Sequence, residues 1–112
     1  MFKNEFGTYG EKIAQKYLIK NEFEIIQMNF KCVIGEIDII AVDKKYLVFV
    51  EVKCRTSDKF GRPCEAVTYA KQKKIRRIAE LYLKKIGALN ALVRFDVIEI
   101  LGKEINHIKN AF

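Results

Sequence analysis

GEIDIIAVDKKYLVFVEVKCR, residues 35–55, is the stretch that decides the fold. Residues 35–42 and 46–55 are rich in β-branched and aromatic side chains, and a short turn at 43–45 separates them, which predicts a β-hairpin. A hairpin centred between Lys44 and Lys45 would place Ile40 opposite Phe49. A shift of one residue would carry every side chain to the other face of the sheet, so this register is a specific prediction.

The predicted register divides the charges of the hairpin unevenly. One face is apolar throughout and holds Ile37, Ile39, Ala41, Val48, Val50 and Val52. The other face is apolar near the turn but charged far from it, where Asp38 would lie opposite Glu51 and Glu36 opposite Lys53. Directly opposed carboxylates destabilise a hairpin unless something neutralises them.

A divalent cation would neutralise such a pair, because Mg²⁺ is commonly held by one or two carboxylates together with water and phosphate oxygens. Lys53 could then orient a water molecule or stabilise charge that develops on a phosphate. The alternative is a solvated sheet face that carries Asp38 and Glu51, with Lys53 and Glu36 in ordinary cross-strand salt bridges.

The rest of the chain predicts one α/β domain, residues 1–112, with the element order α-β-β-β-α-β. The predicted helices cover about 8–20 and 65–86, and Gly87 fits the end of the second. The predicted strands outside the hairpin cover 23–31 and 93–101, and a short edge strand is possible after residue 103. The only proline, Pro63, marks a loop at 56–66. We therefore expect a central mixed sheet flanked by helices.

Glu11 is the acidic residue of the first helix that could join the hairpin acids. It shares a helix side with Ala14 and Leu18 at the edge of the apolar stripe, so it could point partly inward as a third carboxylate. The alternative is a solvated glutamate at the boundary of the helix.

Composition narrows the classes of function. The net charge of +7 favours a polyanionic partner, either nucleic acid or an anionic membrane surface. No run approaches the ~20 apolar residues that a membrane span needs, and no signal peptide is evident. The three cysteines form no CxxC, which indicates reduced thiols in a cytoplasmic protein. One histidine, His107, near the chain end argues against Ser–His or Cys–His catalysis.

Basic residues gather in the second predicted helix, where residues 71–77 read KQKKIRR, and around the 56–66 loop. They are either a surface that contacts phosphates or an ordinary solvated face. The candidate contacts to nucleic acid are Arg55, Lys59, Arg62, Lys71, Gln72 and Lys74.

These segments together resemble the YraN family of small bacterial proteins over nearly the whole chain, from about Gly7 to Phe112. The block GEIDIIA…VFVEVKCR is the most specific part of the resemblance, and FGRPCEAV, RFDVIEI and the terminal HIKNAF add to it. By similarity that family belongs to the PD-(D/E)XK nuclease superfamily, which includes restriction enzymes and archaeal Holliday-junction resolvases.

The resemblance implies a restriction-endonuclease-like fold in which Asp38 is the first acid and Glu51-Val52-Lys53 is the (D/E)xK element. Asp38, Glu51 and the backbone carbonyl of Val52 would bind Mg²⁺ or Mn²⁺, and Lys53 would position the attacking water. Glu11 matches the acid in the first helix of resolvase-like members.

The function predicted from these patterns is a Mg²⁺-dependent endonuclease that hydrolyses DNA, with branched or repair-related structures as the substrates that the resemblance suggests. The alternative is a non-catalytic module that binds nucleic acid with the same fold, and a structural interaction protein is the third class. The sequence leaves the oligomeric state open, although a homodimer would suit an enzyme that cuts duplexes or junctions.

Overall fold

The computed structural model describes residues 5–55 and 67–112, and for residues 5–8 and 55 it describes the backbone only. The elements are α1 (Glu5–Lys20), β1 (Glu24–Lys31), β2 (Glu36–Asp43), β3 (Tyr46–Arg55), α2 (Tyr69–Ile86), β4 (Val93–Leu101) and β5 (Glu104–Ile108). This order confirms the predicted α/β class, and β5 is the edge strand that the sequence left open. The predicted loop at 56–66 lies outside the described residues.

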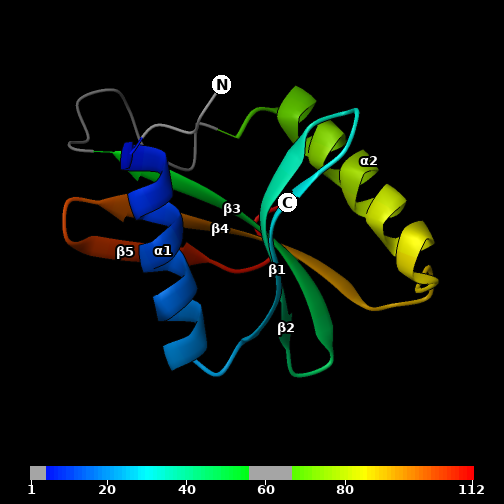
Figure 1. The fold of residues 1–112 in the computed structure, drawn as a ribbon, viewed down its shortest axis with the longest axis horizontal. Coiled ribbons are helices and arrows are strands. Elements are labelled where there is room, and N and C mark those ends of the chain that lie inside the picture. The colour runs from blue at the N-terminus through cyan, green and yellow to red at the C-terminus, as the bar shows by residue number, and fades with distance from the viewer. Residues whose placement is uncertain (1–4, 56–66) are drawn as a thin grey trace.

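The described strands form one mixed sheet in the order β1-β2-β3-β4-β5. Strands β3 and β4 run parallel, whereas each of the other neighbouring pairs is antiparallel. A parallel pair needs a crossover connection, and α2 lies within it. Helices α1 and α2 cover opposite faces of the sheet (Figure 1).

Alternation along the strands produces a separate apolar core under each helix. Beneath α2, Ile40 and Phe49 pack with Ile78 and Tyr82 of the helix. Beneath α1 the core contains Ala14, Leu18, Ile39, Val48, Val50 and Ile98. One hairpin residue departs from the predicted face: Ile37 belongs to the cluster under α2.

Local signals explain where α2 begins and ends. Thr68 caps its N-terminus, since the Thr68 hydroxyl accepts a hydrogen bond from the Lys71 backbone N–H at 3.2 Å. The helix therefore begins at Tyr69, later than predicted. Gly87 ends it at φ 71°, a left-handed conformation that favours glycine. No helix among the described residues is long and apolar enough to cross a membrane.

A buried ionic cluster fastens the C-terminal strands to the rest of the sheet. Asp96 is fully buried on β4 and accepts hydrogen bonds from the Arg94 guanidinium (2.9 Å), the Asn110 N–H (3.0 Å) and His107 Nε2 (2.7 Å). His107 Nδ1 lies 3.2 Å from the Tyr17 hydroxyl of α1. Burial raises the pKa of Asp96, but the hydrogen bonds from His107, Arg94 and Asn110 outweigh burial and hold this pKa below its usual value. The contacts of His107 with Asp96 and Tyr17 therefore give it a structural role between β4, β5 and α1.

Candidate metal and nucleic-acid site

The β2–β3 hairpin has the predicted register near its turn but separates before it reaches the carboxylates. Paired residues run from Asp43–Tyr46 to Ile39–Val50, and Ile40 faces Phe49 as expected. The two predicted charged pairs, Asp38–Glu51 and Glu36–Lys53, are not part of the ladder, so that part of the prediction is wrong.

A side-chain contact takes over where the ladder stops. Asp38 Oδ2 accepts a hydrogen bond from the Val52 backbone N–H at 2.8 Å. The carboxylate therefore fills the role of a strand partner and fixes Asp38 against β3. Glu36 pairs instead with Lys31 of β1 and is exposed.

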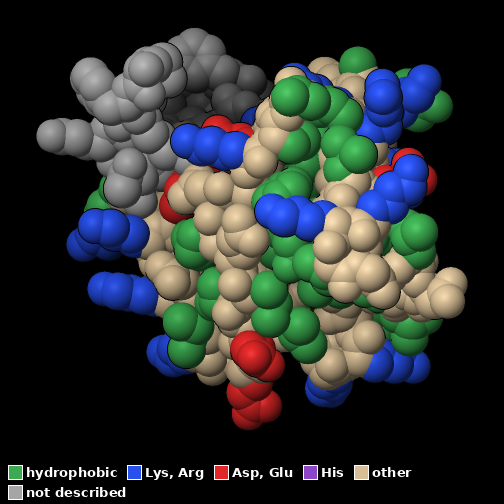
Figure 2. Space-filling model, turned by 45° about the vertical axis from the view of Figure 1, so that its right-hand side comes forward, with side chains coloured by type: hydrophobic (Ala, Val, Ile, Leu, Met, Phe, Trp, Pro, Cys, Tyr) green, Lys and Arg blue, Asp and Glu red, His purple; other side chains and the backbone are tan. Residues whose placement is uncertain are grey.

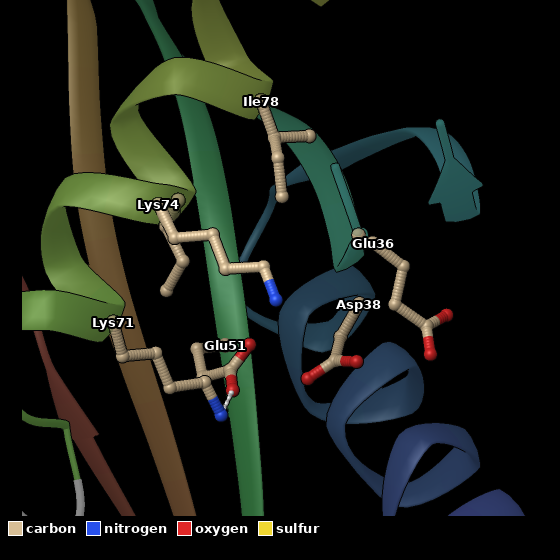
Figure 3. A pocket seen from close by; sticks show the side chains of 8 residues that line it. Glu36, Asp38, Glu51, Lys71, Lys74 and Ile78 are labelled. Carbon is tan, nitrogen blue, oxygen red and sulfur yellow. Dashed lines mark ion pairs between the residues drawn. The ribbon is translucent and has the colours of Figure 1, made fainter. Parts of the chain in front are cut away.

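Asp38 and Glu51 nevertheless line one cavity, of about 360 Å³, between the sheet and α2. Its other lining residues are Gly35, Glu36, Lys71, Lys74, Ile75 and Ile78. Figure 3 shows the Asp38 carboxylate directed toward Glu51, with Lys71 and Lys74 reaching into the cavity from α2. The carboxylate of Glu36 points away from Glu51 (Figure 3). Two acids and two lysines thus meet on the charged side of the hairpin.

Glu51 is the centre of the ionic contacts in this cavity. It is only 8% exposed, and burial of a carboxylate requires compensating positive charge. Lys71 Nζ lies 2.6 Å from Glu51 Oε2, and Lys53 Nζ lies 3.4 Å from the same oxygen. One carboxylate oxygen therefore contacts two ammonium groups.

The two lysines respond to this arrangement in opposite directions. Burial lowers the pKa of Lys53, and the neighbouring Lys71 lowers it further, against the attraction of Glu51. Burial would also lower the pKa of Lys71, but hydrogen bonds to Glu51 and Lys53 and the charges of Glu51 and Asp38 outweigh it and raise this pKa. Lys71 is therefore the lysine with the higher pKa of the two, and the negative charges of both Glu51 and Asp38 act on it.

The donor chemistry of this cavity suits a hard divalent cation. Carboxylate oxygens are the ligands that Mg²⁺ and Mn²⁺ prefer, and Asp38 and Glu51 both face the cavity. The Lys71 ammonium group already supplies a positive charge that interacts with both carboxylates. Within residues 5–55 and 67–112, however, no group of three or more His, Cys, Asp or Glu side chains is arranged to hold a metal ion. Any cation here would depend on these two acids, on backbone or water oxygens, or on substrate phosphates.

The remaining predicted site residues lie in several places. Glu11 is 7% exposed on α1, which packs on the other face of the sheet, and it does not line the cavity. Gln72 donates from Nε2 to the Val67 carbonyl at 3.1 Å, so it secures the start of α2. Arg55 ends β3, and its side chain, like Lys59 and Arg62, lies outside the described residues.

Lys71 was predicted as a contact to nucleic acid, whereas its ion pair with Glu51 was not predicted. The two residues lie on different elements, and the pattern within α2 does not show which residue of β3 Lys71 will meet. The phase of the apolar stripe Ile75–Ile78–Tyr82 was the available signal, since Lys71 lies one turn before Ile75 on that stripe.

Positive charge extends from the cavity over the outer surface of α2. Lys73, Lys74 and Arg77 line a neighbouring hollow of about 290 Å³ with Ile34 and Ala70. Figure 2 shows lysine and arginine side chains spread over this side of the molecule, with hydrophobic side chains between them. A surface of this kind favours contact with phosphate groups.

The fold and the cavity define a small α/β domain that carries an acid–lysine site on the α2 face of its sheet. The chain belongs to the uncharacterised protein family UPF0102, the YraN family, whose sequence model matches residues 10–100, so the resemblance seen in the sequence is confirmed. A UPF0102 protein of Clostridioides difficile (strain 630) is 48% identical over 114 residues and is covered completely, as is this chain. Another, from Caldanaerobacter subterraneus subsp. tengcongensis, is 50% identical and covers 98% of this chain and 96% of its own length.

Proposed function

We propose that this protein is a metal-dependent nuclease that hydrolyses phosphodiester bonds in DNA. The observation that carries the proposal is that Asp38, Glu51 and Lys71 line one cavity below a lysine-rich helix. Lys53 contacts Glu51 beside them. These are the side-chain types that phosphoryl chemistry uses, namely carboxylates to hold a cation and ammonium groups to stabilise negative charge.

Asp38 and Glu51 would hold Mg²⁺ or Mn²⁺, aided by the Val52 carbonyl. The bound cation would supply a Lewis acid for the scissile phosphate and a lowered pKa for its water ligand. The hydrogen bond from the Val52 N–H fixes the Asp38 carboxylate before any ligand arrives, which reduces the reorganisation needed on binding.

The lysines would act on substrate rather than on the cation. Lys53 contacts Glu51 at 3.4 Å, next to where the cation would bind, so it suits a group that orients the attacking water. Lys74 reaches into the same cavity from α2 and is exposed, in a position to contact a phosphate next to the scissile one. The basic surface of α2 would guide the rest of the DNA backbone.

The test is a cleavage panel over branched, single-stranded and duplex DNA and over RNA, with Mg²⁺ or Mn²⁺. Wild-type protein should cleave at least one DNA substrate in a cation-dependent way, whereas Asp38→Asn should lose cleavage and keep most of its DNA affinity. Equal cleavage by wild type, Asp38→Asn and Glu51→Ala would attribute the activity to a contaminant and end the proposal.

One observation favours a second candidate, a module that binds nucleic acid without cutting it. The ion pair with Lys71 compensates Glu51 without any cation, so the acidic residues can be stable in a protein that never binds metal. Salt-sensitive DNA binding that is indifferent to Mg²⁺, combined with no cleavage across the panel, would support this candidate over the nuclease.

A further inference from the structure

Glu99 on β4 has a buried carboxylate that the site described above does not use. It is 4% exposed, although a carboxylate is rarely buried without full compensation. Asn106 of β5 supplies one partner, since its Nδ2 donates to Glu99 Oε1 at 2.8 Å. Among buried side-chain nitrogen and oxygen atoms of the described residues, Glu99 Oε2 is the one with no hydrogen-bond partner. A carboxylate oxygen left unpaired in this way is costly, so a cationic donor that can reach it would be stabilising.

Lys53 is the cationic residue that the sheet places beside Glu99. The parallel register pairs Lys53 of β3 directly with Glu99 of β4, just as it pairs Phe49 with Phe95. The two phenylalanine rings stack beneath α2 with centroids 5.7 Å apart, which identifies the face of the sheet. Because side chains alternate along a strand, Lys53 and Glu99 lie on that same face, on strands about 4.8 Å apart. Glu99 therefore has Asn106 on one side and Lys53 on the other.

Lys53 shares its carboxylate partner, Glu51, with a second lysine. Its ammonium group shares Glu51 Oε2 with Lys71, at 3.4 Å against 2.6 Å. A divalent cation on Glu51 would add further positive charge at this oxygen, and like charges at such distances repel. Lys53 would then need another anionic partner within reach of its side chain, and Glu99 is the neighbour across the strand.

The geometry points to Glu99 as a positioning residue that receives the Lys53 ammonium group when Glu51 binds a divalent cation. This inference rests on the proposed cation site at Asp38 and Glu51. Lys53 then has two positions, one on Glu51 in the cation-free protein and one on Glu99 in the loaded protein. Glu99 keeps the ammonium group in the site and frees Glu51 for the cation, so binding of the cation and movement of Lys53 are coupled.

A double-mutant cycle on cation affinity tests this coupling without any need for cleavage. Mn²⁺ binding to the full-length chain would be measured by calorimetry for wild type, Glu99→Gln, Lys53→Met and the double variant. Glu99→Gln keeps the shape and the Asn106 contact but removes the charge that attracts Lys53. We expect it to weaken Mn²⁺ binding about tenfold in the wild-type background and less than about twofold in the Lys53→Met background.

Glu104→Gln is the matched control. Glu104 and Glu99 both line a cavity of about 370 Å³, but Glu104 lies on β5, on the far side of β4 from Lys53. The Glu104→Gln variant removes the same charge as Glu99→Gln. Because solvent screens the charge of Glu104, this variant should change Mn²⁺ affinity by less than about twofold. Thermal unfolding of each variant would confirm that affinities are compared between folded proteins.

The possible outcomes separate cleanly. If Glu99→Gln weakens Mn²⁺ binding equally with and without Lys53, Glu99 acts on the cation itself and the positioning role is wrong. If Glu99→Gln has no effect in either background, the role is also wrong, while the cation site at Asp38 and Glu51 stands. If wild type binds no Mn²⁺, the proposed function fails first and this inference falls with it.

Discussion

Replacing Lys71 by Met should tighten the binding of divalent cations, because the Lys71 ammonium group occupies the position that a cation would take at Glu51. Its nitrogen lies 2.6 Å from Glu51 Oε2, and its charge is coupled to Asp38 as well. At an effective dielectric constant of ~20, two unit charges ~4 Å apart interact by about 4 kcal/mol. The Lys71 side chain is 39% exposed, so solvent screening reduces its effect; exposed pairs contribute up to about 1 kcal/mol. Between these limits we expect about 1–2 kcal/mol, or about 5- to 30-fold tighter binding.

The assay is titration of Mn²⁺ or Mg²⁺ into the metal-free protein, followed by calorimetry. Lys73→Met is the control, because it removes the same charge from the exposed side of the same helix and does not line the cavity. Both variants should weaken DNA binding to a similar degree, since both remove one positive charge from the surface. Equal cation affinity in Lys71→Met and Lys73→Met would refute the idea that Lys71 competes with a cation for Glu51.

Other predictions address the pH dependence, the packing and the hydrogen bond at the end of the hairpin. Asp96→Asn should lower the free energy of unfolding at pH 7 by about 3–5 kcal/mol, because it breaks a buried ionic cluster. The pKa of Asp96 in the folded protein lies below its usual value of 3.8, so its charge stabilises the wild type above that value. This contribution is lost as the pH falls through the folded-state pKa, so the free energy of unfolding of the variant, measured by chemical denaturation, should depend less on pH in acid. Equal pH dependence of the two proteins would contradict this. Gly10→Val should destabilise by about 1–3 kcal/mol, measured by thermal unfolding, since an added Cβ would lie 2.9 Å from Cys54 Cβ; an unchanged midpoint would show that α1 can move away from β3. Asp38→Ala should speed amide hydrogen exchange at Val52 by at least about tenfold if this bond protects the amide, and unchanged exchange would show that the 2.8 Å hydrogen bond is not maintained in solution.

Local patterns were sufficient for most of the fold. Strand alternation in residues 35–55 predicted the hairpin and its register near the turn, because a slip would have exposed Ile39 and Val50. Gly87 predicted the end of α2 for an equally local reason, because glycine readily adopts the left-handed backbone conformation that ends the helix there. The start of α2 was predicted at residue 65, four residues too early. Thr68 caps the helix, and the sequence pattern did not identify it as the cap.

The separation of β2 from β3 could not be foreseen from pattern alone. Alternation continues through Asp38 and Glu51 in the sequence, yet pairing stops at Ile39–Val50. A carboxylate that accepts the Val52 N–H competes successfully with the continued ladder, since it satisfies the same donor and avoids placing two acids face to face. The two acids line one cavity, but they are not the directly opposed pair that the pattern predicted.

The sequence by itself determined the elements, the two-sided character of the hairpin and the set of charged residues available to a site, because these depend on chemical type and on spacing within about ten residues. The tertiary structure alone decided that Lys71 contacts Glu51 and that Glu99 lies beside Lys53. Both contacts depend on how the crossover through α2 sets one helix and one parallel strand against β3. That placement follows from packing of the whole apolar core, which no short stretch of the chain encodes.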